Sequence, residues 1–279
     1  MMLQQQPAEH HGPPDSIFTP VWRAIKDEAW SKRIGFDNPD RHLGQFWFEA
    51  ICFSLIAATV LVVCAFIATR DYRRVPRGLQ NILEAAVGFI RGLVHGFMGP
   101  AGDRYVPYLG TVFLYIFAMN MLGIIPAFRS PTMTLSTTAA LGITTFIMVQ
   151  GYAIAGTGLW AYLKHFTAGT AFPLCLLLIV VEIIGDLAKP LSLSLRLFGN
   201  IFGEDNVIEQ LMGLGKAWYI PVQVPMLALA VFTSLLQAFI FTTLATIYIA
   251  SKVVHEHEEG HGDEHGHGEH HEEHKAHAH

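Results

Sequence analysis

Five mostly apolar stretches, each about as long as a bilayer is thick, constrain this chain more than any other feature. A membrane-spanning helix needs about 20 apolar residues, and only helices or closed barrels satisfy their backbone hydrogen bonds in lipid. Charged residues make up 15% of the chain, against about a quarter in soluble proteins. We therefore predict an all-α membrane protein with about five transmembrane helices, over residues 46–69, 106–127, 133–158, 172–203 and 222–250.

The last two of these stretches are longer than a perpendicular crossing requires. Residues 172–203 would form a helix of about 48 Å at 1.5 Å per residue, against a hydrocarbon core of about 30 Å. We expect both helices to tilt, and Pro190 to bend the first of them. The segment that follows, residues 203–221, is more polar and is predicted to be a connection.

Charge patterning predicts an orientation for the chain in the membrane. Four arginines lie between residues 70 and 77, directly after the first span, and such clusters stay on the cytoplasmic side. Residues 79–99 repeat apolar side chains every three or four positions, which favours an amphipathic helix lying along the membrane surface. Five crossings then place the N-terminus outside and the C-terminus in the cytoplasm.

These features divide the chain into three parts, namely a polar extracytoplasmic segment (1–45), a membrane domain (46–252) and a cytoplasmic tail (253–279). The tail has ten histidines interleaved with acids and glycines, a composition that cannot bury a core and is expected to be disordered. It is either a solvated extension or a weak metal-binding segment, with His265, His267, His270 and His271 as candidate ligands. The second interpretation leaves a metal-ion transporter as an alternative function. No basic patch suggests nucleic acid as a partner, and no motif indicates a cofactor.

Ionisable residues inside the fourth span are the strongest functional signal, because charges in a membrane are costly and usually functional. Glu182, Asp186 and Lys189 are spaced four and three apart and share one helical face. Arg196 and Asn200 continue that face two and three turns further on. Lys189 is expected to pair with Asp186 or to reach towards the membrane boundary.

Polar and small residues mark where this helix is expected to meet a neighbour. Gly199 and Gly203 are four apart beside the polar face, a spacing that lets a second helix approach closely. In the last span Thr233 and Gln237 lie one turn apart. A glutamine in hydrocarbon needs a hydrogen-bonding partner, so we expect the polar face of the preceding helix to provide one.

The amino-acid sequences of these segments resemble those of a known family. KPLSLSLRLFGN at 189–200, IFGED at 201–205 and LQAFIFTTLATIYIA at 236–250 are similar to subunit a of the F-type ATP synthase. The layout agrees from residue 46 to 252, including NMLGIIP at 120–126, and does not cover the N-terminal segment or the tail.

The resemblance implies a stator subunit of a membrane motor in a bacterial inner membrane. Such a subunit lies against a ring of c subunits, contacts b-type peripheral stalk subunits, and provides two half-channels for protons to and from the ring carboxyl groups. It does not hydrolyse ATP itself, which fits the absence of a GxxxxGK[ST] phosphate-binding sequence. The matching positions are Arg196 as the essential charge, and Glu182, Asn200, Asp205 with adjacent Glu204, and Gln237 in the proton path.

This chain departs from the family at one position. A histidine or another polar residue often stands seven residues before the glutamine, and here that residue is Ala230. Asp186 and the Glu204–Asp205 pair are candidates for the missing role. The chemistry of Arg196 suits its implied function, because a guanidinium keeps its charge and so cannot relay a proton.

Overall fold

The computed structural model describes residues 16–25, 41–70, 76–125, 128–157, 174–218 and 223–253. Within these ranges the chain is helical and contains no β-strand, which confirms the predicted all-α class. The predicted second span is shorter than expected, since its helix ends at Leu122, and residues 126 and 127 lie outside the described ranges. The long helices are α3 (Arg41–Arg70), α4 (Leu79–Met98), α5 (Val106–Leu122), α6 (Leu135–Thr157), α8 (Leu174–Trp218) and α9 (Gln223–Val253).

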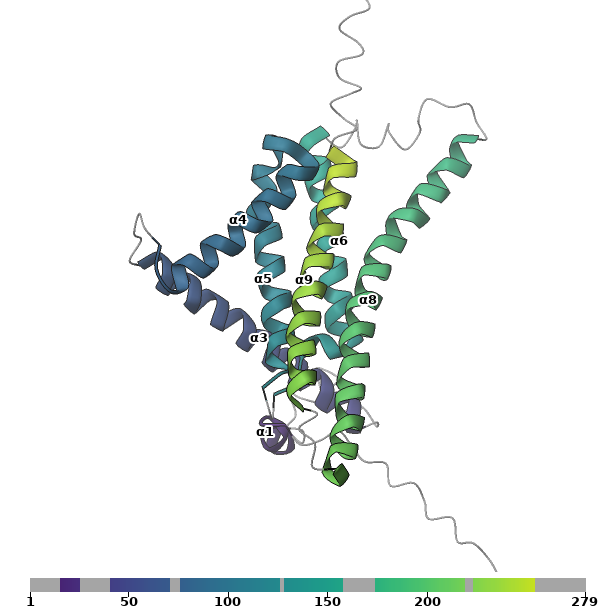
Figure 1. Cartoon of the computed structure of the whole chain (residues 1–279). Coiled ribbons are helices and arrows are strands. Elements are labelled where there is room, and N and C mark those ends of the chain that lie inside the picture. Colours follow the sequence, from purple (N-terminus) through teal and green to yellow (C-terminus); the bar gives the residue numbers. More distant parts are fainter. Residues whose placement is uncertain are drawn as a thin grey trace, which may run out of the picture.

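Helix α9 is the centre of the bundle. It lies against α5, α6 and α8, while α6 also packs along α8 and α3 packs on α5 (Figure 1). Apolar residues of α5, α8 and α9 form the core, with Ile116, Leu197 and Phe241 fully buried. We name the two ends of the bundle after α9, so that its first residue marks the Gln223 end and its last residue the Val253 end.

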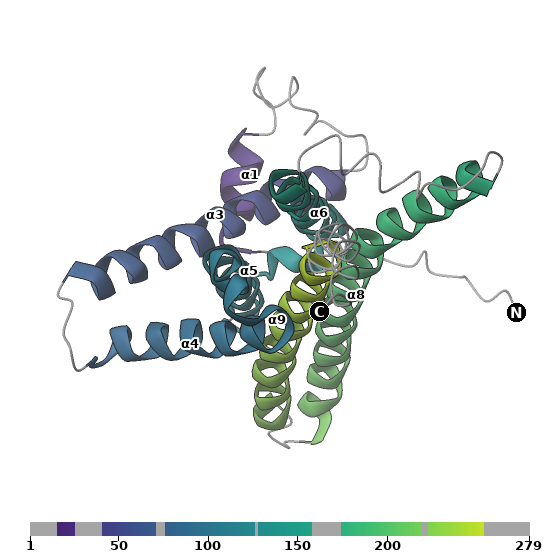
Figure 2. The same ribbon diagram turned by 90° about the horizontal axis from the view of Figure 1, so that it is seen from above.

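Helices α3 and α4 project from one side of this bundle and meet α5 at their inner ends (Figures 1 and 2). Gly99 ends α4 with a φ of 60°. Residues other than glycine rarely adopt a backbone conformation with a positive φ. A 3-10 helix, η1 (Gly99–Tyr105), then reverses the chain into α5, which starts with Pro107 in its first turn. The short helix α1 (Thr19–Ile25) lies at the Gln223 end.

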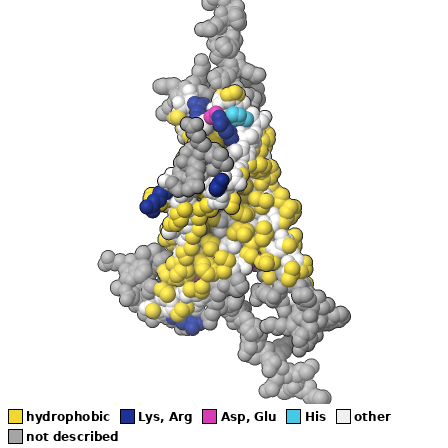
Figure 3. Space-filling model, turned by 60° about the vertical axis from the view of Figure 1, so that its left-hand side comes forward, with side chains coloured by type: hydrophobic (Ala, Val, Ile, Leu, Met, Phe, Trp, Pro, Cys, Tyr) yellow, Lys and Arg dark blue, Asp and Glu magenta, His cyan; other side chains and the backbone are white. Residues whose placement is uncertain are grey.

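The surface of the bundle is suited to lipid. Figure 3 shows hydrophobic side chains over much of the face from which α3 and α4 project, with most charged groups in the upper half of the view and a further basic group at the lower end. Four described stretches are long and apolar enough to span a membrane, namely Gly44–Arg70, Leu79–Leu122, Leu135–Gly156 and Val224–Lys252. The placement of α4 along a membrane surface stays a prediction.

Helix α8 differs from its prediction at its C-terminal end. The segment 203–221 was expected to be a connection, but the helix continues to Trp218. No proline interrupts residues 191–218, and Val207 and Leu211 repeat at helical spacing, so nothing local stops the helix. Its 45 residues correspond to about 67 Å of helix.

The helix also continues through Pro190. A proline cannot donate the usual backbone hydrogen bond to the residue four positions earlier. The first turns of α8 point away from the bundle, and the later turns run beside α9 (Figures 1 and 2). The predicted change of direction along this helix is therefore present.

Candidate functional site

Arg196 lies on the exposed side of α8. On the same helix, the exposed residues around it are the apolar Leu191, Leu195 and Phe202 together with Ser192, Gly199 and Asn200. Its guanidinium makes no hydrogen bond or ion pair with the residues that the structure describes. A charge at the middle of a membrane helix costs about 3 kcal/mol or more, so this position calls for an anionic partner beyond the residues that the structure describes.

One turn further along α8, Asn200 reaches across to α9. Its Nδ2 donates a hydrogen bond of 2.6 Å to Oε1 of Gln237, which confirms the predicted partner for that glutamine. Gln237 is 1% exposed, and its Nε2 finds no acceptor among the described residues. The buried amide nitrogen of Gln237 thus has two N–H groups without an acceptor among the described residues.

Glu204 extends this polar region by another turn. Oγ1 of Thr233, on α9, donates a hydrogen bond of 2.6 Å to its Oε2. Asp205 is half-buried beside Glu204. An open groove of about 290 Å³ lies between α8 and α9 here, and its polar lining consists of Asn200, Glu204, Thr233 and Gln237.

A second polar cluster lies on the other side of Arg196, towards the Val253 end. Asp186 is buried and accepts a bond of 2.8 Å from Lys189 on its own helix. Lys252 of α9 lies 2.8 Å from its other oxygen, and Gln150 of α6 donates to it at 3.2 Å. Lys252 also lies 3.4 Å from Glu182. The predicted pairing of Lys189 with Asp186 is therefore present, within a larger network.

Arg196 separates these two clusters along α8. It stands ten positions after Asp186 and eight positions before Glu204, which are about 15 Å and 12 Å of helix. The residues of the predicted polar face therefore follow one another along α8, but their side chains do not all face the same neighbours. Glu182, Asp186 and Lys189 point towards α6 and α9, whereas Arg196 points outwards.

The predicted close contact at Gly199 and Gly203 is not made within the described chain, because no atom lies within 4 Å of a Cβ placed at either glycine. The close approach is at Gly142 of α6 instead. A Cβ there would lie about 2.1 Å from Oγ of Ser194 and 2.8 Å from the carbonyl oxygen of Pro190. Only glycine lets α6 come this near to α8, just before Arg196.

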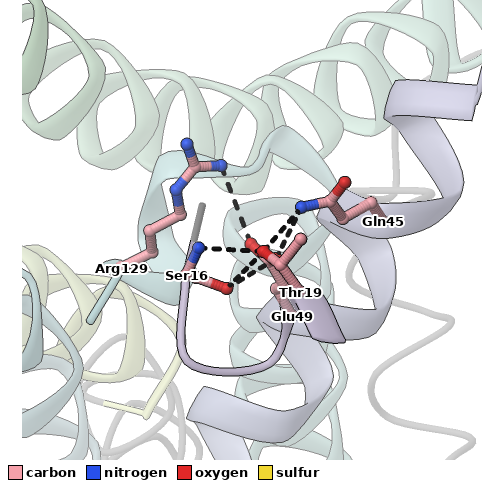
Figure 4. A network of polar contacts seen from close by, with 5 residues as sticks. All are labelled: Ser16, Thr19, Gln45, Glu49 and Arg129. Atoms are coloured by element: carbon pink, nitrogen blue, oxygen red, sulfur yellow. Dashed lines mark hydrogen bonds and ion pairs between the residues drawn. The ribbon is translucent and has the colours of Figure 1, made fainter. Parts of the chain in front are cut away.

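One polar network was missed by the sequence analysis. Glu49 of α3 is 1% exposed, and its Oε1 accepts hydrogen bonds from Ser16 at 2.6 Å, Gln45 at 2.8 Å and Thr19 at 3.2 Å (Figure 4). Arg129, from the turn after α5, lies 3.7 Å from its Oε2. The only sequence signal was a glutamate in the first turns of an apolar span.

The described residues contain no group of three or more histidine, cysteine, aspartate or glutamate side chains arranged to hold a metal ion. Near the α4–η1 junction, Asp103 is paired with Arg91 at 2.7 Å and with His95, all on the surface. The candidate ligands His265, His267, His270 and His271 lie outside the described residues.

Known proteins similar in sequence to this chain provide independent information about its family. The family model described as ATP synthase A chain matches residues 51–250. The ATP synthase subunit a of Moorella thermoacetica is 40% identical over 217 residues, which cover 77% of this chain and 95% of that protein. The subunit a of Geobacter sulfurreducens is 37% identical, with coverages of 77% and 92%, and that of Protochlamydia amoebophila is 36% identical, with coverages of 76% and 82%.

Proposed function

This chain belongs to the ATP synthase A chain family, whose members are part of the membrane sector of ATP synthase, and we propose that it is the stator subunit. In this role it conducts protons to and from the c-ring. The observation that carries this proposal is the exposed Arg196 between two polar clusters. A guanidinium on an apolar surface needs an anionic partner. The mid-membrane carboxyl groups of a c-ring would provide one each time a subunit passes.

Arg196 acts in this proposal as a fixed charge. A positive charge beside a carboxyl group favours its ionised form, so a ring carboxyl arriving at Arg196 releases its proton. At an effective dielectric constant of about 20, charges 4 Å apart attract by about 4 kcal/mol. Since a guanidinium does not deprotonate, it also blocks direct proton transfer between the two sides.

The two polar clusters are then the two proton paths. Asn200, Glu204, Asp205 and Gln237 belong to the path that opens into the groove between α8 and α9. Glu182 and Asp186 belong to the path at the Val253 end. Ala230 leaves a gap in the family pattern, and the hydrogen bond between Thr233 and Glu204 supplies polar groups one turn away from it.

The proposal also covers the orientation of the chain in the membrane, its partner subunits and the place where ATP chemistry occurs. The arginines between residues 70 and 77 favour a cytoplasmic position for that loop, so the Val253 end faces the cytoplasm of a bacterial inner membrane and the N-terminus lies outside. The partners are the c-ring, b-type stalk subunits, the other subunits of the complex and lipid. ATP chemistry takes place in those other subunits, and this chain is non-catalytic.

Replacing Arg196 tests the proposal. In a complex reconstituted into vesicles, Arg196→Ala is expected to abolish ATP synthesis driven by a proton gradient while the complex still assembles. The matched control is Leu187→Ala, which removes an exposed apolar side chain from the same helix and is expected to keep synthesis. Coupled synthesis by an assembled Arg196→Ala complex would refute the role.

A further inference from the structure

Lys252 is shared between the two carboxylates of the Val253 end. Its ammonium lies 2.8 Å from Oδ2 of Asp186 and 3.4 Å from Oε1 of Glu182, and its side chain is only 13% exposed. It comes from the last turn of α9, some 70 residues away in sequence from either acid. The sequence analysis did not single it out.

The two acids differ in how they are held. Asp186 is 8% exposed in its side chain and accepts hydrogen bonds from groups on three helices, namely Lys189 on α8, Lys252 on α9 and Gln150 on α6. Two positive charges beside one buried carboxylate favour its ionised form. Asp186 is therefore suited to be a fixed negative charge that ties the three helices together.

Glu182 lies one turn earlier on α8 and is more open, with 30% of its side chain exposed. It contacts the ammonium of Lys252 at the longer distance of 3.4 Å. The ammonium of Lys252 therefore places a positive charge beside a carboxyl group that is partly open to the surroundings. The cluster thus holds one enclosed carboxylate and one more open carboxyl group, and both lie beside Lys252.

We propose that Lys252 is a positioning residue of this proton path, which holds Asp186 as a fixed counter-charge and fixes the position of the Glu182 carboxyl group. This inference rests on the proposed function. It adds a residue of α9 to the path at the Val253 end, for which the sequence analysis named only Glu182 and Asp186 of α8. Among the described residues, this cluster includes the charged or titratable groups of Glu182, Asp186, Lys189 and Lys252, and the ring of Tyr248 lies 5.5 Å from the Lys189 ammonium.

Lys189 provides a matched control within the same cluster. It donates to Asp186 at 2.8 Å, the same distance as Lys252. Within the described part of the chain, however, its contacts are with Asp186 and the Tyr248 ring and not with Glu182. Removing either ammonium leaves Asp186 with one lysine and with Gln150, so only the effect on Glu182 distinguishes the two variants.

The test measures passive proton conduction by the membrane sector in vesicles, after the catalytic sector has been removed from the assembled complex. Lys252→Met is expected to lower conduction about tenfold, the effect of losing one favourable charge contact at a carboxyl group of the path. Lys189→Met, which removes a contact with Asp186 but none with Glu182, is expected to lower conduction clearly less than Lys252→Met. Lys252→Arg, which keeps the charge, is expected to restore most of the conduction.

Several results would overturn the inference. Equal losses from Lys252→Met and Lys189→Met would show that both lysines only neutralise Asp186, and unchanged conduction in Lys252→Met would show that its charge is not used. If Lys252→Met does not assemble, Lys252→Gln, which keeps a donor for Asp186 without the charge, replaces it, and parent-level conduction would again contradict the proposal. Loss of synthesis in Arg196→Ala together with an inert Lys252 would reject this inference alone, whereas retained synthesis in Arg196→Ala would reject the proposed function.

Discussion

The buried ion pair between Glu49 and Arg129 gives the sharpest test of the fold. Glu49 is almost fully enclosed, and its Oε2 has no hydrogen-bond donor among the described residues, so Arg129 at 3.7 Å provides the opposite charge. The pair joins α3 to the turn after α5, and hydrogen bonds from Ser16 and Thr19 add α1 to the same network.

The magnitude follows from the distance and the burial. Two opposite charges 3.7 Å apart attract by about 4.5 kcal/mol at an effective dielectric constant of 20. Removing one partner of a buried pair costs about 3–5 kcal/mol, because the other charge stays buried alone. We expect the loss of stability in Arg129→Met to lie near the lower limit of this range. The reason is that three hydrogen bonds to Oε1 of Glu49 still stabilise the glutamate.

The assay is a double-mutant cycle on the free energy of unfolding, measured by denaturant titration in detergent micelles. Trp22 of α1 is 6% exposed and its ring lies 5.6 Å from Phe48, so with the other four tryptophans replaced by phenylalanine its fluorescence reports on this region. Arg129→Met and Glu49→Gln are each expected to lose about 3 kcal/mol, and the double variant to lose clearly less than their sum, because it leaves no buried charge.

The exposed pair of Arg91 and Asp103 is the control for this cycle. Their side chains are 58% and 44% exposed, and ion pairs on the surface contribute little to stability because water and salt screen them. Arg91→Met is therefore expected to change stability little. Additive losses for Glu49→Gln and Arg129→Met, or equal effects of Arg91→Met and Arg129→Met, would refute the argument that a buried ion pair holds these segments together.

Two further predictions concern the contact between α6 and α8 and the tail. Gly142→Ala is expected to cost about 1–3 kcal/mol and to reduce the yield of assembled complex, because its Cβ would overlap Ser194 and the Pro190 carbonyl. Gly151→Ala on the same helix meets no atom within 4 Å and is the control, so equal yields would contradict the prediction. Deletion of residues 255–279 is expected to leave proton-driven ATP synthesis nearly intact in vesicles, and loss of assembly would show that the tail is more than an extension.

The sequence alone determined the helices and their approximate limits. Hydrophobic length and periodicity are local properties, so residues 46–69 and 222–250 predicted α3 and α9 to within a few positions. The end of α8 was predicted wrongly, because the polarity of residues 203–221 suggested a connection, whereas the helix lies against α9, where Glu204 bonds to Thr233. The sequence also indicated that Arg196 is functional, since a permanent charge in an apolar run demands an explanation wherever it points.

Only the tertiary structure decided which polar groups meet. The contacts of Glu49 with Arg129, and of Lys252 with Asp186 and Glu182, join residues about 70 or more positions apart. Helical periodicity fixes which residues share a face of one helix, but it does not fix which helix that face meets. Helix packing also decides that the close approach is at Gly142 rather than at Gly199, and that Arg196 points outwards between two polar clusters. Burial and pairing are properties of the assembled bundle and not of any one segment.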